Sequence, residues 1–392
     1  MRETGLRAVR LCAISPSASL QVCAGIGIRV PVMGKEPREI NAKSLKLQAA
    51  SRDDDGFFST FILRKISIRF TSVLVERNVS PNTVTLLSLL VGFIAAYVAA
   101  QGSYLAGGSL LLLSLILDCV DGEIARYKSA FSALGAWLDA LSDRVKEFVY
   151  IFALIYSIDQ ESAWWSGVVI IALQTTRHLS DYNFARLQKS YEESSTSIRQ
   201  KNIFYWVKKI IHLPIGERWL LLAVLPIFLS IEQTLRSIIY LGAFSFLYVL
   251  ITRIRRMRRW KNPVASTDFL DRQRDSLLPL KISGSKASWI FPSLLRALEF
   301  FALLMITNDA SAFIRFILLF AISIWHYTNL YDALHGRASY MGAGGLRVAG
   351  RISLCFIAQL FGLEAEVSLF LSLYLLALIL LRGGHNVSGG KK

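Results

Sequence analysis

The sequence has few charged residues and few cysteines, and each shortage excludes a class of protein. Only 18% of its 392 residues are charged, against about 25% in soluble domains, which disfavours an ordinary soluble protein. The hydrophobic share of 53% is too high for a disordered chain. No two cysteines form a CxxC pair, which argues against a disulfide framework or a zinc site. They are Cys12, Cys23, Cys119 and Cys355.

Acidic residues are also scarce, since 28 Asp and Glu stand against 44 Lys and Arg. The net charge is +16 and the pI is about 9.8. A basic, hydrophobic chain is typical either of a nucleic-acid binder or of a membrane protein with its positive charge on one face. The positions of the charges decide between the two.

Ten apolar runs are candidates for membrane-spanning helices. Such a helix needs about 20 predominantly apolar residues, and several of the runs are shorter because polar residues occupy one end of the expected helix. They fall into a group of six and a group of four. The first group is 83–100, 104–117, 145–158, 164–173, 219–231 and 235–251, and the second is 289–307, 312–324, 352–363 and 367–381.

The segments between these runs alternate in charge. One set is almost free of Lys and Arg, whereas the other set carries most of the basic residues, as in Arg253–Lys261. Positive loops stay in the cytosol, so both termini are expected there. Because the charge is spread along one membrane face, the nucleic-acid interpretation is rejected.

Other segments divide the chain further. Residues 203–213 have the pattern of an amphipathic helix lying in the membrane interface, and residues 57–77 are placed there by composition. Residues 1–32 lack the apolar core of a signal peptide. We therefore expect a cytosolic N-terminal segment (1–55), a first membrane domain (56–260), a cytosolic linker (261–287) and a second membrane domain (288–381).

Four aspartates lie together where two predicted spans meet the cytosolic face. Asp118 and Asp121 end the second span, and Asp139 and Asp143 begin the third. At about 100° per residue, each pair shares a helical stripe with small residues, which let a ligand or a facing helix approach closely. The small residues are Gly122, Ala125 and Gly135.

Carboxylates at a bilayer edge are costly and repel one another unless cations neutralise them. Oxygen ligands favour Mg²⁺, Mn²⁺ or Ca²⁺, and two such ions sharing carboxylates suit displacement at phosphorus. Arg126 follows the first stripe and could contact phosphate. The alternative is a set of solvated aspartates paired with Arg126, Lys128 and Arg144, but four aspartates on two complementary stripes favour the metal site.

These residues resemble a known family. The pattern Asp118-x2-Asp121-Gly122-x2-Ala125-Arg126-x8-Gly135-x3-Asp139-x3-Asp143 is similar to the signature of the CDP-alcohol phosphatidyltransferases. Ser80-Pro81-Asn82-Thr83-Val84-Thr85 resembles the Pro-Asn-x-Leu/Val-Thr motif of the same family. The resemblance covers about residues 55–260. The whole layout is similar to actinobacterial members that carry an extra C-terminal membrane domain.

The resemblance implies a six-helix membrane bundle with a cytosol-facing cleft, in which a CDP-alcohol donor transfers its substituted phosphate to an alcohol and releases CMP. It further implies that Asp118, Asp121, Asp139 and Asp143 ligate two divalent ions, with Mg²⁺ the first choice and Mn²⁺ the alternative. Asp143 is also the implied general base. The implied CDP-binding residues are Asp118, Gly122, Ala125, Arg126 and Gly135.

The acceptor is predicted from position alone. Arg177, His178 and Asp181 lie at the cytosolic end of the fourth predicted span, near the expected cleft. Arg177 or His178 could hold the phosphate of an acceptor such as inositol phosphate or glycerol phosphate. A pair of Arg177 and Asp181 that anchors a helix end explains them equally well. Glu217 and Arg218 are expected to pair at a helix start.

The sequence therefore predicts an all-α polytopic enzyme of the cytoplasmic membrane, with its site facing the cytosol and about four further spanning helices after the six-helix bundle. Its expected partners are a CDP-alcohol, an alcohol or phosphorylated polyol acceptor and the lipid bilayer, and it is compatible with a homodimer. Two alternatives stay open. One is a CDP-inositol-type transferase with a soluble phosphodiester product. The other is a non-enzymatic transporter or scaffold that uses the carboxylates for ion passage.

Overall fold

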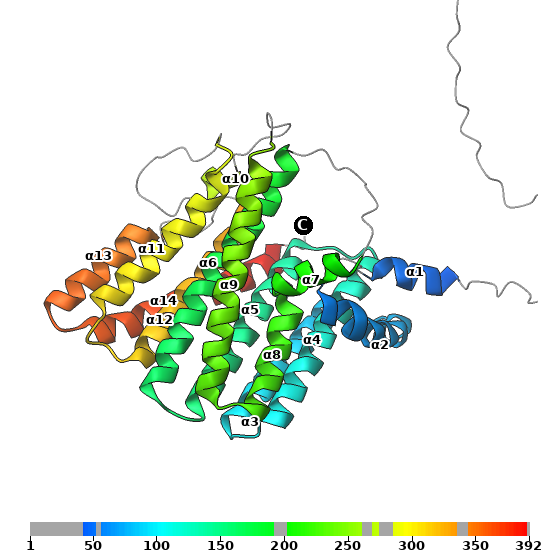
Figure 1. Ribbon diagram of the computed structural model, residues 1–392, viewed down its shortest axis with the longest axis horizontal. Coiled ribbons are helices and arrows are strands. Elements are labelled where there is room, and N and C mark those ends of the chain that lie inside the picture. Colours follow the sequence, from blue (N-terminus) through cyan, green and yellow to red (C-terminus); the bar gives the residue numbers. More distant parts are fainter. Residues whose placement is uncertain are drawn as a thin grey trace, which may run out of the picture. The chain divides into compact units, whose positions relative to one another are not determined.

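The computed structural model describes residues 42–51, 56–191, 202–260, 269–273, 285–334 and 344–389. Within these ranges the regular structure is helical and there is no strand, so the predicted all-α class is confirmed. Most of the expected N-terminal segment and linker lie outside the described residues. The helices are α1 (Ala42–Ala50), α2 (Arg64–Glu76), α3 (Pro81–Ala100), α4 (Tyr104–Tyr127), α5 (Ala133–Tyr156), α6 (Glu161–Tyr191), α7 (Ile203–Ile211), α8 (Ile215–Phe228), α9 (Ile231–Met257), α10 (Phe269–Arg272), α11 (Phe291–Ile306), α12 (Ala312–Leu334), α13 (Arg347–Leu360) and α14 (Glu364–Gly389) (Figure 1).

Six helices in the described part of the chain are long and apolar enough to cross a membrane, so the protein is a multi-pass membrane protein. They are α3, α4, α9, α11 with the turn before it, α12 and α14. A seventh span results if α7 and α8, which meet at a bend of 67°, are counted as one.

The other predicted spans also coincide with helices, but these helices do not meet the same criterion. α8 and α13 have only 14 residues each. α5 and α6 have 24 and 31 residues, and polar and charged side chains interrupt their apolar runs. Ten helices thus correspond to the ten predicted spans, while length and composition support six or seven. In α5, the charged residues are those of the aspartate cluster and its neighbours.

Helix caps fix where α3 and α5 begin. Ser80 has extended backbone before α3, its Oγ accepts from the amide of Thr83, and Pro81 opens the helix. Ser132 caps α5 in the same way, with its Oγ 2.9 Å from the amide of Gly135. A side-chain acceptor at this position satisfies an amide that lacks a partner within the helix. Both caps therefore set the helix starts that border the aspartate cluster.

The helices around the cluster approach closely at glycines. A Cβ at Gly108 of α4 would lie 2.4 Å from the carbonyl oxygen of Ala223 in α8, a separation that side chains do not reach. A Cβ at Gly92 of α3 would lie 2.6 Å from Cγ of Lys146 in α5. Small residues permit this close packing of membrane helices.

The C-terminal helices pack onto the first group through α12. In the apolar window of α12, 72% of the residues are buried, against 22–50% in the other five spans, so α12 is an interior helix. It contacts both α5 and α6 (Figure 1). Thr175 donates to Ser323 at 2.9 Å, and the rings of Phe148 and Phe320 lie 6.2 Å apart at a steep angle. The residues from Ala42 onward form one compact unit.

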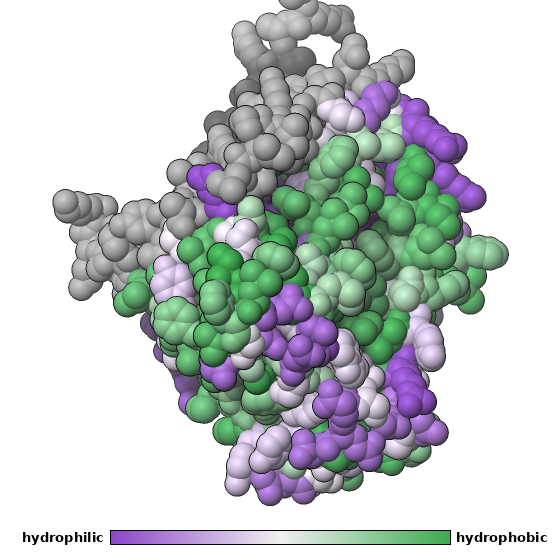
Figure 2. All heavy atoms as spheres, turned by 90° about the vertical axis from the view of Figure 1, so that its left-hand side faces the viewer, coloured by the Kyte–Doolittle hydropathy of each residue, from purple (hydrophilic) through white to green (hydrophobic). Residues whose placement is uncertain are grey.

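The outer surface carries many apolar side chains, as expected for a protein in contact with lipid. Figure 2, viewed from the side of α11 and α13, shows hydrophobic residues spread over much of that face and hydrophilic ones at its lower edge. Around α7, Trp206 lies 4.8 Å from the ring of Phe61 and 5.9 Å from that of Phe57. α7 contains no buried residue and carries Lys208 and Lys209 in its last turn, consistent with the predicted interfacial helix.

Candidate active site

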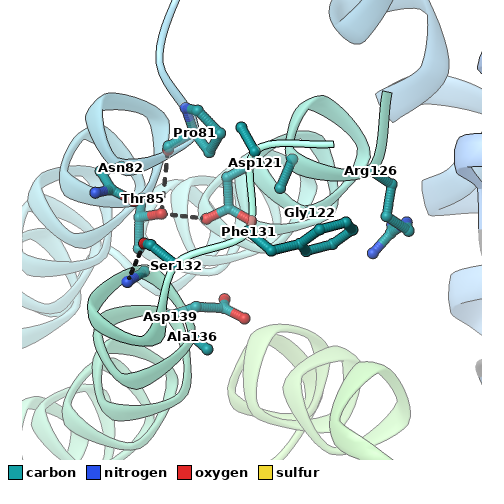
Figure 3. Close-up of a pocket in the computed structure, with 13 residues that line it drawn as sticks. Pro81, Asn82, Thr85, Asp121, Gly122, Arg126, Phe131, Ser132, Ala136 and Asp139 are labelled. Carbon is teal, nitrogen blue, oxygen red and sulfur yellow. Dashed lines mark hydrogen bonds between the residues drawn. The ribbon is translucent and has the colours of Figure 1, made fainter. Parts of the chain in front are cut away.

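Three of the four predicted aspartates meet between α4 and α5. One carboxylate oxygen from each of Asp118, Asp121 and Asp139 lies within 4.8 Å of the other two. Figure 3 shows Asp121 and Asp139 on neighbouring helices with their carboxylates turned toward the same space. The ligand atoms of one divalent cation, at about 2.1–2.5 Å from it, lie about 3–5 Å from one another. This aspartate cluster could therefore hold a metal ion.

Hydroxyl groups of α3 orient two of these carboxylates. Thr85 donates to Oδ2 of Asp121 at 2.6 Å, and both residues are 3% exposed. Ser88, one turn further along α3, donates to Oδ1 of Asp118 at 2.6 Å. Such outer-shell donors hold metal-binding carboxylates in position. Sequence reasoning quoted Thr85 only as part of a motif and missed Ser88.

Lys146 is a further missed residue. Its ammonium is fully buried and lies 2.5 Å from Oδ2 of Asp118 and 2.8 Å from Oγ of Ser88. It also lies 5.2 Å from the centre of the Trp219 ring. Lys146 follows Asp143 by three residues, so it lies on the acidic side of α5. This spacing could have identified it from the sequence. The aspartates are thus accompanied by a lysine that was not foreseen, and not by Arg144, which belonged to the alternative set of solvated ion pairs.

Asp143 lies one helical turn beyond Asp139 and does not belong to the group of three. Its Oδ1 is buried, lies 3.6 Å from Nζ of Lys146, and has no hydrogen-bond partner among the described residues. The carboxylate side chain is 21% exposed. Within the described part of the chain, this oxygen of Asp143 therefore makes an ion pair with Lys146 but accepts no hydrogen bond.

A cavity of about 430 Å³ opens beside the cluster, within the range of about 300–1,000 Å³ typical of small-molecule sites. Asp121 and Asp139 line it together with four residues predicted to bind CDP, namely Gly122, Ala125, Arg126 and Gly135 (Figure 3). Asp118 is not among its lining residues. The motif before α3 contributes as well, through Pro81, Asn82 and Thr85.

Two glycines shape this cavity. A Cβ at Gly135 would lie 2.9 Å from both Oδ1 of Asn82 and the capping Oγ of Ser132. A Cβ at Gly122 would lie 3.1 Å from a guanidinium nitrogen of Arg126, whose Nε donates to the carbonyl of Ala50. Larger residues would therefore displace the polar groups that line the cavity.

Arg144 points away from the cluster. It donates to Glu147 at 2.8 Å and contacts Nδ1 of His178 at 3.0 Å, and His178 lies 2.8 Å from the hydroxyl of Tyr327 in α12. Glu147 also accepts from Arg218 of α8 at 2.9 and 3.2 Å. Arg218 is thus paired with α5, not with its neighbour Glu217 as predicted. Glu217 instead accepts from the amide of Phe58 at 3.2 Å.

The three residues predicted to bind the acceptor lie in three different environments. His178 is buried against α12, as described above. Arg177 is buried, donates to the carbonyl of His212 and lies 3.8 Å from Asp181. Asp181 is the one that faces a large cavity, and it pairs with Arg253 at 2.5 Å. The anchoring pair of Arg177 and Asp181 is therefore present.

That second cavity, of about 790 Å³, lies among α6, α7 and α9. Four Lys and Arg side chains line it, and among the described residues Asp181 is the one acidic residue in the lining. The basic residues are Lys208, Lys209, Arg253 and Arg256. Such a lining suits a phosphorylated or otherwise anionic ligand. Sequence reasoning used these residues to set membrane orientation and did not foresee that they gather in one cavity.

Comparison with known proteins identifies this part of the chain. The family model described as CDP-alcohol phosphatidyltransferase matches residues 78–254. The chain is 37% identical over 139 residues to "Bifunctional IPC transferase and DIPP synthase" of Thermococcus kodakarensis, covering 35% of this chain and 32% of that protein. The protein of the same name from Aquifex aeolicus is 35% identical over 137 residues, covering 33% and 31%.

Another relative, "CDP-diacylglycerol--serine O-phosphatidyltransferase" of Mycobacterium bovis, is 32% identical over 112 residues, covering 28% of this chain and 39% of that protein. The matched part thus spans about a third of the length of these curated relatives. The family match at residues 78–254 includes the aspartates of α4 and α5 and the residues that line the first cavity. The similarity to the CDP-alcohol phosphatidyltransferase family thus covers residues 78–254 of this chain.

Proposed function

We propose that this protein transfers a substituted phosphoryl group from a CDP-alcohol to an alcohol acceptor and releases CMP, in the synthesis of a phospholipid or a polar headgroup. The observation that carries the proposal is the meeting of Asp118, Asp121 and Asp139 beside the 430 Å³ cavity. A carboxylate cluster next to a cavity lined by glycines and an arginine suits a donor that carries a pyrophosphate.

In this proposal the donor's cytidine and pyrophosphate occupy the first cavity. Gly122, Ala125 and Gly135 leave room for it, and Arg126 contacts its phosphates. Asp118, Asp121 and Asp139 would hold a divalent cation, for which Mg²⁺ is our first choice and Mn²⁺ the alternative. When bound, the cation would supply positive charge that stabilises the leaving phosphate. A second ion, as expected from the sequence, would have to use Asp143 and the oxygen of Asp118 that Lys146 contacts.

Asp143 is the proposed general base. Its Oδ1 has no hydrogen-bond partner among the described residues and can therefore accept a proton. It takes the proton of the acceptor hydroxyl as the hydroxyl oxygen attacks the β-phosphorus of the donor. The bond from that phosphorus to the CMP oxygen breaks, and CMP leaves with the bonding electrons.

We propose the second cavity as the acceptor site. Its four basic side chains favour an acceptor that carries a phosphate, such as a phosphorylated polyol. Asp181 contributes by orienting Arg253, while Arg177 supports the wall through the carbonyl of His212. His178 keeps only an indirect role, because it contacts Arg144 and Tyr327.

Two features of the setting are proposals as well. The basic loops favour a cytoplasmic membrane with the aspartate cluster facing the cytosol. The expected domain limits (1–55, 56–260, 261–287 and 288–381) remain a proposal, as does a homodimer. The mass of the particle in a mild detergent, corrected for bound detergent, tests the homodimer.

The two alternative functions differ in what they require. A soluble phosphodiester product agrees with the basic cavity and with relatives named "DIPP synthase". A radiolabelled acceptor whose product stays in the aqueous phase would favour it over a lipid product. A transporter requires ionisable groups along a path through the spans. The buried Glu299 instead has both oxygens bonded, to Arg351 at 2.6 Å and His326 at 2.8 Å.

The proposal is tested by measuring CMP release from purified protein across a panel of CDP-alcohols and acceptors with Mg²⁺. We expect release with one donor class, and loss of at least 100-fold in kcat for Asp143→Asn, because positioned bases contribute about 10²–10⁴-fold. Asp159→Asn is the matched control, since Asp159 follows the opposite end of α5. Normal turnover by folded Asp143→Asn would remove Asp143 from this role. Absence of CMP release with every donor would contradict the function.

A further inference from the structure

Lys146 lies beside the aspartate cluster and links its member Asp118 to the neighbouring Asp143. Its Nζ is 2.5 Å from Oδ2 of Asp118 and 3.6 Å from Oδ1 of Asp143. No part of the residue is exposed. A buried ammonium group requires negative partners, and these two carboxylates supply them.

The surroundings of Lys146 are built to hold it. Gly92 of α3 leaves space for the aliphatic chain, since a Cβ there would lie 2.6 Å from Cγ and 2.7 Å from Cδ of Lys146. Ser88 accepts a second hydrogen bond from Nζ at 2.8 Å. The ring of Trp219, from α8, faces the ammonium at 5.2 Å, within cation–π range. Residues of α3 and α8, together with Asp118 of α4, thus define one position for this charge.

The same position is where a second divalent ion would have to bind. The group of three carboxylates offers one place for a cation, between Asp118, Asp121 and Asp139. A second ion held by Asp118 and Asp143 would need oxygens of both at about 2.1 Å. The Lys146 ammonium already lies between these two side chains, and two cations in contact repel each other.

We propose that Lys146 takes the place of the second metal ion, so that this protein binds one divalent cation, at Asp118, Asp121 and Asp139. The lysine neutralises part of the acidic charge and keeps Asp143 beside the metal position without making it a ligand. Asp143 thereby retains an oxygen for the acceptor proton. Lys146 is a positioning residue in this arrangement, because it acts through Asp118 and Asp143.

The inference rests on the proposed function only in taking the aspartate cluster to be a cation site, and its test does not need turnover. Purified full-length protein in a zwitterionic detergent is titrated with Mn²⁺, and the free Mn²⁺ is followed by its electron paramagnetic resonance signal. We expect one tightly bound Mn²⁺ per chain, and loss of that ion in Asp121→Asn. Two tight ions in the unaltered protein would overturn the inference.

The substitution Lys146→Met removes the ammonium but keeps an unbranched chain beside Gly92. We expect this variant to bind two Mn²⁺ per chain, because the second position becomes available. Lys146→Gln serves the same purpose if the first variant does not fold. The matched control is Lys128→Met, which removes a lysine that donates to the carbonyl of Val79 at 2.9 Å, and it should still bind one ion. A single ion in folded Lys146→Met would also overturn the inference.

The two proposals fail in different ways. Two bound ions together with CMP release would reject the role of Lys146 and leave the transferase function standing. One bound ion without CMP release from any donor would reject the function and leave the ion count standing. A merely structural role for Lys146 would lower stability but would not raise the number of bound ions.

Discussion

The bond from Thr85 to Asp121 gives the clearest quantitative test of the site. Thr85 donates through Oγ1 to Oδ2 of Asp121 at 2.6 Å, with a weaker contact to the carbonyl of Pro81 at 3.2 Å. Valine has nearly the shape of threonine, so Thr85→Val removes the donor without opening a cavity. Asp121 then loses the hydroxyl that orients its buried carboxylate.

The size of the effect follows from the kind of bond that is lost. A hydrogen bond to a charged group contributes about 1.5–3 kcal/mol. Removing an outer-shell partner of a metal ligand lowers metal affinity about 10–100-fold, and at about 1.4 kcal/mol per tenfold change the two estimates agree. We therefore expect Thr85→Val to raise the dissociation constant for Mn²⁺ by about 10–100-fold.

The assay is a titration of Mn²⁺ into the purified variant, with thermal unfolding in the same detergent to confirm that it is folded. Thr85→Ser keeps a hydroxyl on the same Cβ and should retain affinity within a few-fold. Thr83→Val alters a neighbouring threonine that contacts Ser80 at 3.2 Å instead of an aspartate, and it should bind Mn²⁺ normally. If folded Thr85→Val binds Mn²⁺ as tightly as the unaltered protein, Asp121 is not a ligand whose orientation matters.

Two further predictions concern the packing behind the site. Gly108→Ala should lower the free energy of unfolding by about 1–3 kcal/mol, through overpacking against the backbone of Ala223, and a drop in melting temperature measures it. Gly242→Ala, where the new Cβ meets only a side-chain methyl of Leu173 at 3.2 Å, should change stability far less, and equal losses would contradict the reasoning. Glu147→Gln should cost about 3–5 kcal/mol, because it leaves the buried guanidinium of Arg218 without its charge partner. Unchanged folding yield and melting temperature would show that this pair carries no such energy.

The sequence predicted the parts of the site that depend on local spacing. The stripes of α4 and α5 follow from helical periodicity, and their carboxylates do meet, with Asp143 outside the closest group. The small residues of the cavity, Gly122, Ala125 and Gly135, were also recognisable from their spacing. These features involve residues a few positions apart, for which helix geometry is a sufficient guide.

Features that depend on the rotation of one helix against another were not predictable in this way. Lys146 was one of many basic residues until α3 placed Gly92 and Ser88 against it. Arg218 stood beside Glu217 in the sequence, yet it bonds to Glu147, which lies 71 positions away. The second cavity likewise draws on three helices. The spacing of residues within one helix does not show which residues of different helices come into contact.

The contact of α12 with α5 and α6 has a consequence for the order of events during synthesis. α5 and α6 leave the ribosome long before α12, so the polar groups that face α12 must wait for their partners. Among them are His178, which meets Tyr327, and Thr175, which meets Ser323. Until α12 is inserted, these groups lie next to lipid, where a polar group without a hydrogen-bond partner has a high free-energy cost. The nascent first domain is thus incomplete in the bilayer until α12 is inserted, and the insertion of α12 sets the time at which the domain matures.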